Sequence, residues 1–274
     1  MNYIGIDIGT TNVKIIEVNQ NLEILKKDIF KNDNAKKILE KFIKNNKIDL
    51  SNIEFIVATG VGAQKLDDTF ENIQVKKVSE FSSIAEAGKL YGNNSNFIVA
   101  SIGTGTAFIK NKNGKITHEG GTGVGGGTLI NLCDRIIPEI TFEKINRITK
   151  EGNLNNVDLW IKDVTEEKIK TLPPDITAVN LGKLSNKTSN DDLIFGIVNM
   201  IFETVGVMAA LIAKNNEIKN IIAIGQITKI PYAIEVFKKI ELLHNVKFII
   251  PENSEYMVVL GAIKVSLNTQ KEDF

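Results

Sequence analysis

The sequence predicts an α/β fold built from two βββαβα units that face each other across a cleft. The first observation is a pair of Gly/Thr turns, at residues 9–11 and 103–106, each following an apolar strand. The second is that each turn leads into another β-rich stretch, at residues 13–18 and 107–110. The third is that strands and helices alternate through the rest of the chain. Because the same start occurs twice, we expect a duplicated pair of domains.

The elements follow from apolar runs bounded by turn residues and from apolar residues three or four positions apart. In the first unit we expect strands at 3–8, 13–18, 23–29, 54–58 and 75–78, and helices at 34–44 and 80–90. In the second unit we expect strands at 97–102, 107–110, 116–118, 221–224 and 246–249, and helices at 128–135, 141–150, 193–213, 232–242 and 256–266. These elements predict an N-terminal domain at 1–94 and a C-terminal domain at 95–274, with an insertion of little regular structure around 152–190.

The composition is that of an ordinary globular protein and excludes several classes. Lys+Arg and Asp+Glu both number 33 in 274 residues, so no net charge marks a nucleic-acid or membrane-surface binder. Cys133 is the single cysteine, which excludes an internal disulfide framework and, with only two histidines, makes a Cys/His zinc site implausible. The chain begins with a strand instead of a signal peptide, and no uninterrupted apolar stretch reaches the roughly 20 residues of a membrane span. We therefore expect a cytoplasmic protein.

The paired turns are typical of a site that binds a polyphosphate from both sides. Glycine lets backbone N–H groups approach a phosphate without a Cβ in the way, and threonine hydroxyls add donors to the same oxygens. The candidate phosphate-binding residues are Gly9, Thr10, Thr11, Gly103, Thr104, Gly105 and Thr106. Asp7 ends the strand before the first turn, where a carboxylate can hold a metal ion or its waters. A single such turn would be an ordinary hairpin with an aspartate cap. The second turn favours the functional interpretation.

A glycine-rich segment follows the second turn, with Gly120, Gly121, Gly125, Gly126 and Gly127 ahead of a predicted helix. Each glycine loses much conformational entropy on folding, so such a run indicates that backbone must lie against a ligand. Helix packing alone would need one or two of them. We expect the helix N-terminus at Thr128 to offer free N–H groups and the positive end of its dipole.

Three further segments resemble type II (eukaryotic-like) pantothenate kinases, which belong to the acetate-and-sugar-kinase, heat-shock-protein and actin superfamily. They are the glycine loop 122–129, the segment Val78-Ser79-Glu80-Phe81 and the segment 172–182 with its Pro-Pro-Asp, Thr-Ala and Asn-Leu-Gly steps. The order and spacing agree from the first residue to the last strand–helix pair. The resemblance implies an actin-like (ribonuclease H-like) fold, ATP and Mg²⁺ as cofactors, pantothenate as the acceptor, and a homodimer.

The resemblance also assigns roles to residues that the sequence alone leaves open. Glu80 opens a helix, where acidic residues are favoured anyway, but in the family a glutamate here is the general base; Glu86 is the second-choice carboxylate. Lys14 interrupts an apolar strand and either points to solvent or reaches ATP; the resemblance favours ATP. ATP contacts are also implied for Gly125, Gly126, Gly127 and for Gly225, where the family wraps the adenosine.

The implied acceptor site holds His118, Gly120 and Gly121. The family has an arginine at the position of His118, and histidine cannot make the same bidentate fork. Lys115, Arg135 or Arg147 could compensate. Because of this departure, a related kinase that acts on a sugar or a pantoyl compound remains an alternative function.

A different class of function is an ATPase sensor or activator that closes on a protein partner. Dehydratase activators of this superfamily hold an iron–sulfur cluster between subunits through bridging cysteines. Cys133 alone would give two thiolates per dimer, whereas a cluster normally needs four, so we expect a cluster-free protein if it belongs to this class.

Overall fold

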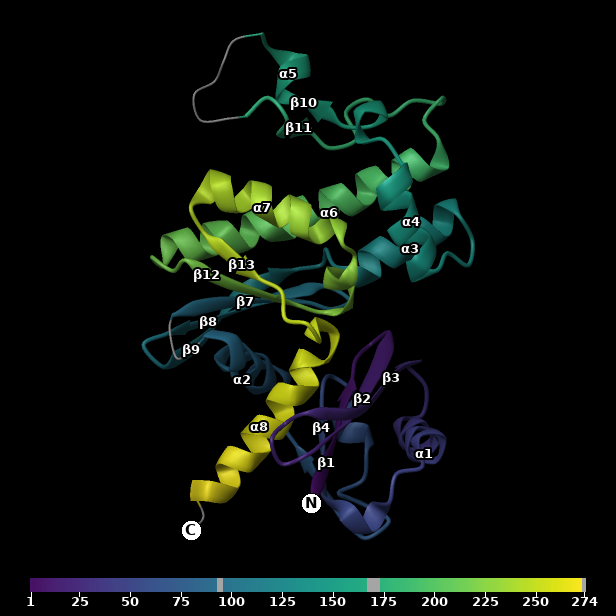
Figure 1. Ribbon diagram of the computed structural model, residues 1–274, viewed down its shortest axis with the longest axis vertical. Coiled ribbons are helices and arrows are strands. Elements are labelled where there is room, and N and C mark those ends of the chain that lie inside the picture. Colours follow the sequence, from purple (N-terminus) through teal and green to yellow (C-terminus); the bar gives the residue numbers. More distant parts are fainter. Residues whose placement is uncertain (93–95, 167–172, 273–274) are drawn as a thin grey trace.

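The computed structural model describes residues 1–92, 96–166 and 173–272, which form two large β-sheets and a small two-stranded one, with helices around and between the large sheets (Figure 1). The first sheet has the strand order β3-β2-β1-β4-β6-β5. Its strands are β1 (Asn2–Ile8), β2 (Asn12–Val18), β3 (Ile24–Lys31), β4 (Ile53–Thr59), β5 (Thr69–Phe70) and β6 (Ile73–Lys77). Strand β1 pairs antiparallel with β2 and parallel with β4, so it lies in the middle of the sheet.

The second sheet repeats the start of the first. Its order is β13-β12-β7-β8-β9, with β7 (Phe97–Ile102), β8 (Thr106–Lys112), β9 (Lys115–Thr122), β12 (Asn220–Ile224) and β13 (Lys247–Ile249). Here β7 pairs antiparallel with β8 and parallel with β12, as β1 does with β2 and β4. The duplication that the paired turns predicted is therefore present in the strand order of both sheets.

Both faces of β1 are covered, because its side chains alternate between two apolar layers. Ile4, Ile6 and Ile8 face helix α1 (Ala35–Asn46), whose Leu39 and Phe42 are fully buried in the same cluster. Asn34 accepts a hydrogen bond from the Lys37 N–H and caps the start of this helix.

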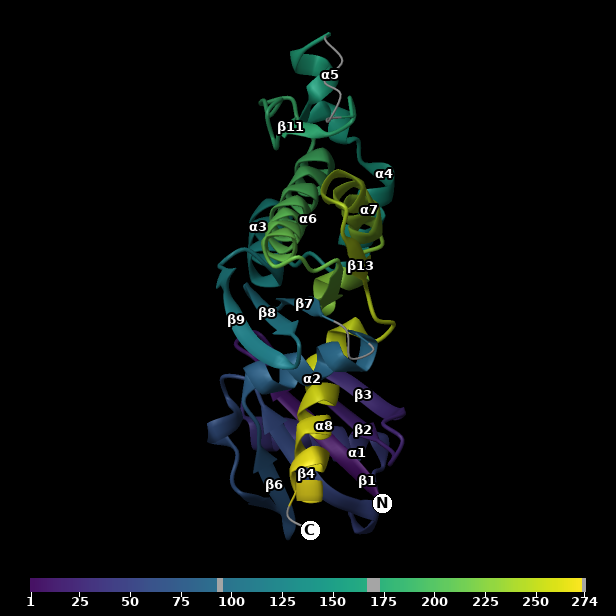
Figure 2. The same cartoon turned by 90° about the vertical axis from the view of Figure 1, so that its left-hand side faces the viewer.

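Helices α2 (Glu80–Gly92) and α8 (Met257–Glu272) lie between the two sheets, as both views show (Figures 1 and 2). The C-terminal helix α8 packs against α2, β1 and β4, so the end of the chain covers the first sheet. A single apolar cluster contains Tyr3 and Val57 of the first sheet, Val99 of the second, and Val259 of α8. The predicted domain boundary between residues 94 and 95 falls outside the described residues and stays a prediction.

The remaining helices cover the other face of the second sheet. They are α3 (Gly126–Ile136), α4 (Phe142–Glu151), α6 (Asn190–Asn215) and α7 (Tyr232–His244). Helix α6 is long and apolar enough to cross a membrane by length and composition, but 67% of its apolar window is buried inside the protein. We therefore interpret it as the core helix of the second unit.

The segment predicted as an insertion contains only short elements in its described part: β10 (Leu159–Trp160), α5 (Ile161–Val164) and β11 (Thr177–Val179). It lies at the end of the molecule far from the first sheet (Figure 1). A buried polar network anchors it, in which Asn199 of α6 donates to Asp158 at 2.8 Å and accepts from the Tyr232 hydroxyl at 3.0 Å.

Two local features differ from the sequence prediction. The β5–β6 hairpin was not predicted, because its turn is formed by Glu71 and Asn72 at φ 46° and 66°, a left-handed pair without glycine. Strand β9 continues through Gly120 and Gly121, whereas the prediction ended it at 118. Gly120 has φ +112° beside an irregularity in the β8–β9 pairing, which a side chain would oppose, and Gly121 lies against the Thr106 carbonyl.

Candidate active site

The two Gly/Thr loops are in direct contact. Thr11 Oγ1 lies 3.1 Å from Thr104 Oγ1, although the residues are 93 positions apart. The Asn12 side-chain amide donates to Gln226 Oε1 at 3.2 Å, so the turn after β12 joins the same contact. Thr11 and Thr104 are both exposed, which leaves this junction open to solvent. The fold thus brings together the two loops that the sequence assigned to one site.

Asp7 and Lys14 form a mostly buried ion pair beside the first loop. The two residues are opposite each other in the β1–β2 register, and Lys14 Nζ lies 3.8 Å from Asp7 Oδ2. Their side chains are only 12% and 11% exposed, so Lys14 is directed into the protein and not into solvent. Burial raises the pKa of the Asp7 carboxyl, and the charge of Lys14 only partly opposes that rise.

Glu80 joins this pair as a third charged group. It is the first residue of α2, and its acidic side chain lies in the first helical turn. Although the residue is exposed, surrounding protein atoms raise the pKa of its carboxyl, the negative charge of Asp7 raises it further, and Lys14 acts in the opposite direction. The second-choice carboxylate, Glu86, forms an ion pair with Lys89 within α2. Glu86 is therefore engaged within its own helix, whereas the charges of Asp7 and Lys14 act on the pKa of Glu80.

The chemistry of Asp7 fits the predicted Mg²⁺. A carboxylate held in a buried position loses hydration, and a divalent cation would restore the lost stabilisation. Within the described ranges there is no cluster of three or more His, Cys, Asp or Glu side chains that could hold a metal ion. A site with few protein ligands suits Mg²⁺, which is commonly bound through one or two carboxylates together with substrate phosphates and water. Asp7 as the metal ligand stays a prediction.

The glycine-rich helix entry lies against the second Gly/Thr loop. The Gly126 N–H donates to the Gly103 carbonyl at 2.8 Å, and the Gly127 N–H donates to the Thr104 carbonyl at 2.9 Å. A Cβ at Gly125 would come within 2.7 Å of Gly105 backbone atoms. Helix α3 begins at Gly126, two positions before the predicted start, and the N–H groups of its first two residues are used in this way. The glycines therefore have a packing reason, and their contact with ATP stays a prediction.

His118 lies on β9 and stacks on Phe81 of α2, the residue after Glu80. The ring centroids are 4.6 Å apart with an interplanar angle of 27°. His118 is exposed and Phe81 is 50% exposed, so the pair lies at the surface next to the predicted base. This aromatic pair was not predicted, because it joins two elements that are distant in sequence.

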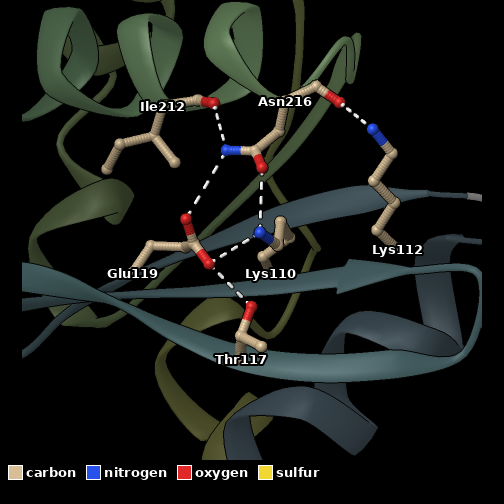
Figure 3. A network of polar contacts seen from close by, with 6 residues as sticks. All are labelled: Lys110, Lys112, Thr117, Glu119, Ile212 and Asn216. Carbon is tan, nitrogen blue, oxygen red and sulfur yellow. Dashed lines mark hydrogen bonds and ion pairs between the residues drawn. The ribbon is translucent and has the colours of Figure 1, made fainter.

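The opposite face of β9 carries a separate polar network (Figure 3). Glu119 accepts hydrogen bonds from Lys110 and from Thr117, and Lys110 also donates to Asn216 Oδ1 at 2.8 Å. Lys112 donates to the Asn216 carbonyl at 2.9 Å, so both lysines satisfy the C-terminal end of α6. The network fixes the strand that leads to Gly120.

Whether another basic side chain can replace the arginine that the family has at position 118 depends on where that side chain lies. Lys115 lines a surface pocket with Lys110, Lys112 and Thr117, on the face of β9 away from His118. Arg147 forms an ion pair with Glu151 on α4. Lys115 is therefore not placed to replace an arginine at position 118.

Gly225 directly follows β12 in a conformation that requires glycine. Its φ is +121°, and a Cβ there would collide with the carbonyl of Ile102, the last residue of β7. Its N–H donates to the Ser254 carbonyl at 2.9 Å. The next residue, Gln226, is the one that contacts Asn12 of the first loop. This geometry explains the glycine, and its contact with adenosine stays a prediction.

Comparison with known proteins agrees with the resemblance in the sequence. The profile of the family described as Fumble matches residues 92–239, more than half of the chain. The chain belongs to the Fumble family. Type II pantothenate kinase from Bacillus anthracis is 29% identical over 233 residues, covering 81% of this chain and 82% of that protein. The enzyme of the same name from Bacillus cereus strain G9842 is 30% identical over 232 residues, with 81% and 82% covered. The predicted family, that of the type II pantothenate kinases, is confirmed.

Solved structures similar to this Fumble-family chain support the fold. The activator of 2-hydroxyisocaproyl-CoA dehydratase from Clostridium difficile, with bound ADPNP, has a TM-score of 0.69 at 18% identity and covers 99% of this chain and 98% of that one. A ROK family glucokinase from Streptomyces griseus, with glucose and AMPPNP, has a TM-score of 0.64 at 12% identity, with 97% and 99% covered. At such identities these likenesses show the fold, and the predicted actin-like α/β fold is confirmed.

Sequence reasoning missed several residues that the fold of this family member brings to the site. Gly60, at φ +85°, follows β4, and a Cβ there would lie 2.6 Å from Asp7 Oδ1. Thr59 is opposite Asp7 in the β1–β4 register and is fully buried. The signal was a third strand ending in Thr-Gly, which repeats the pattern of the two phosphate loops.

Proposed function

We propose that this protein is an ATP-dependent kinase that phosphorylates pantothenate to 4′-phosphopantothenate, the first step towards coenzyme A. The observation that carries the proposal is the mostly buried ion pair of Asp7 and Lys14 beside the first loop. Burial and the charge of Asp7 raise the pKa of Glu80, which agrees with a position of Glu80 near this pair. The contact between Thr11 and Thr104 supports it, because it places the two candidate phosphate loops next to each other. Relatives named type II pantothenate kinase over 81% of the chain support the acceptor.

Each predicted residue then has a role in phosphoryl transfer. The loops at Gly9–Thr11 and Gly103–Thr106 would bind the phosphates of ATP, with Lys14 as a point charge and Asp7 holding Mg²⁺. Bound Mg²⁺ supplies charge neutralisation at the phosphates. Gly125, Gly126, Gly127 and Gly225 are assigned to the remainder of ATP.

Glu80 would orient the acceptor hydroxyl and accept its proton. A general base works best when its pKa is close to the working pH. Burial and the charge of Asp7 move the pKa of Glu80 upward from its ordinary value, which is the direction that this role requires. The acceptor would lie near His118, Gly120 and Gly121, with the exposed ring of Phe81 at its edge.

Two other functions compete with this one. The first is a kinase of the same fold that acts on a sugar or another pantoyl compound, which is favoured by the histidine at position 118. The second is an ATPase sensor or activator, which is favoured by the dehydratase activator among the similar structures. Cys133 is fully buried in the core of the second unit, where it cannot bridge a cluster between subunits. A cluster-free sensor is the remaining form of that alternative.

ATP turnover with and without pantothenate tests the proposal. ADP formation is measured for the wild type, for Glu80→Gln and for Glu86→Gln, and the phosphorylated product is identified by mass spectrometry. We expect pantothenate-dependent turnover that falls at least roughly 100-fold in Glu80→Gln. Glu86→Gln is the matched control on the same helix and should retain activity. Pantothenate-independent ATP consumption that persists in Glu80→Gln contradicts the proposed kinase activity. Turnover that needs a sugar or a pantoyl analogue shows that the acceptor is a compound other than pantothenate.

Thermal unfolding of Glu80→Gln and of the wild type shows whether a loss of activity comes from the missing base or from a destabilised fold. The pKa of Glu80 is raised in the folded protein, so ionisation of this side chain disfavours the native state above that pKa. We therefore expect Glu80→Gln to melt at or above the wild-type temperature at neutral pH, with the difference vanishing in acid, where Glu80 is protonated. The proposal also includes the cytoplasmic location that the sequence predicts and the homodimer that the family resemblance implies.

A further inference from the structure

We infer that the buried hydroxyls of Thr59 and Ser83 are positioning groups that hold the first turn of α2, and with it Glu80, in place beside Asp7. This inference rests on the proposed function, because it concerns the base of the proposed reaction. Thr59 ends β4 and Ser83 lies in α2, and both are 0% exposed. Their hydroxyl oxygens are 3.1 Å apart.

The direction of this hydrogen bond follows from a proton count. The Ser83 hydroxyl donates to the Ser79 carbonyl at 2.9 Å. A hydroxyl has one proton, so Ser83 has none left for Thr59, and Thr59 must be the donor. The result is a directed chain from Thr59 through Ser83 to Ser79.

The chain ends on the residue immediately before Glu80. Ser79 caps α2, because its Oγ accepts from the Ser82 N–H at 3.1 Å and its carbonyl accepts from the Ser83 N–H at 3.0 Å. Thr59 begins the chain, and it is the β4 partner of Asp7 in the sheet register. The hydroxyls therefore connect the strand position next to Asp7 with the helix cap next to Glu80.

The same turn is held from the other side by α8. A Cβ at Gly261 would collide with the Ser83 carbonyl and lie 2.9 Å from the Ala87 nitrogen, so the two helices are in backbone contact. Helix α2 is thus enclosed between the end of β4 and α8. Packing alone limits how far α2 can move, whereas the hydroxyl chain fixes the orientation of its first turn.

Two substitutions at position 59 separate the effect of the hydroxyl group from the effect of side-chain shape. Thr59→Val keeps the volume and removes the donor, whereas Thr59→Ser keeps the donor and removes a methyl group. Small misplacements of a catalytic group are costly, so we expect kcat of Thr59→Val to fall roughly tenfold or more, with KM for ATP unchanged. Thr59→Ser should restore kcat to near the wild-type value.

A second readout does not depend on activity. The Glu80 carboxyl is titrated by ¹³C NMR in the full-length protein, with Glu80→Gln to assign its signal. In Thr59→Val a loosened turn moves the carboxyl away from the protein atoms and the Asp7 charge that raise its pKa, so we expect this pKa to fall towards the ordinary glutamate value. Thr59→Ser should titrate like the wild type. Ser83→Ala breaks the chain at its centre and should give the same fall if Thr59→Val does not fold.

The outcomes distinguish the inference from the proposed function. A wild-type Glu80 pKa in both Thr59→Val and Ser83→Ala overturns the inference. Equal losses of kcat in Thr59→Val and Thr59→Ser also overturn it, because shape and not the hydroxyl would then be responsible. If the wild type shows no acceptor-dependent turnover, the proposed kinase is wrong, and the NMR titration still decides whether the hydroxyl chain positions Glu80.

Discussion

Gly261→Ala tests the backbone contact between α8 and α2, on which the placement of the first unit against α8 depends. The added methyl would collide with the Ser83 carbonyl oxygen and lie 2.9 Å from both the Ser83 carbonyl carbon and the Ala87 nitrogen. These are backbone atoms of a helix, which cannot rotate aside as the end of a side chain can. Relief therefore requires α2 and α8 to separate.

The magnitude follows from two opposing effects. Overpacking at a buried contact costs about 1–3 kcal/mol. Alanine in place of glycine inside a helix returns about 1 kcal/mol of helix propensity. Taking the upper end for a clash with backbone, we expect a net loss of about 2 kcal/mol, which for a domain of this size lowers the melting temperature by roughly 4–8 °C.

The assay is thermal unfolding followed by far-UV circular dichroism, with Gly206→Ala as the matched control. Gly206 lies in the buried helix α6, but a methyl there would meet the Cδ1 end of Ile240 and the ring of Phe237, which are side-chain atoms. We expect a smaller loss in the control, because Ile240 can change rotamer. If Gly261→Ala is as stable as the wild type, or more stable, the argued contact between helix backbones is wrong.

Two further predictions concern ionisation. Burial and the charge of Asp7 raise the pKa of Glu80, and activity should fall as the pH drops through this raised pKa. We therefore expect the acid limb of kcat/KM to lie above the ordinary glutamate pKa of about 4.3. A profile that stays flat down to about pH 4.3 would contradict the assignment of Glu80. Burial raises the pKa of the Cys133 thiol to about 12, so a disulfide reagent at neutral pH should label it only after denaturation, and rapid labelling of the native protein would show that the core around α3 is open.

Several features of the site could be predicted because they are encoded over a few neighbouring residues. The strand before Asp7 and the turn after it are visible in a run of apolar residues that ends in Gly-Thr-Thr. The long helix expected at 193–213 was found in the same way, from residue type and spacing. The family resemblance supplied Glu80, which its helix position alone would have assigned to ordinary helix electrostatics.

Other features depend on contacts between distant segments, which no local pattern contains. Lys14 was ambiguous in the sequence, because alternation along a strand does not say which face meets solvent; the structure places it against Asp7. The glycines at 125–127 were attributed to a ligand, yet they lie against residues 103–105, over twenty positions earlier in the chain. Lys115 seemed close enough to replace an arginine at His118, but strand alternation puts the two on opposite faces of β9.

The sequence by itself predicted the duplicated fold and its two Gly/Thr loops, since both follow from local periodicity and motif spacing, and its resemblance to known kinases gave the family. Only the tertiary structure decided that Thr11 meets Thr104, that the charges of Asp7 and Lys14 act on Glu80, and that the hydroxyls of Thr59 and Ser83 join the strand to the helix. The physical reason is that burial and charge coupling depend on distances between elements, and packing of α8 and α2 between the two sheets sets those distances.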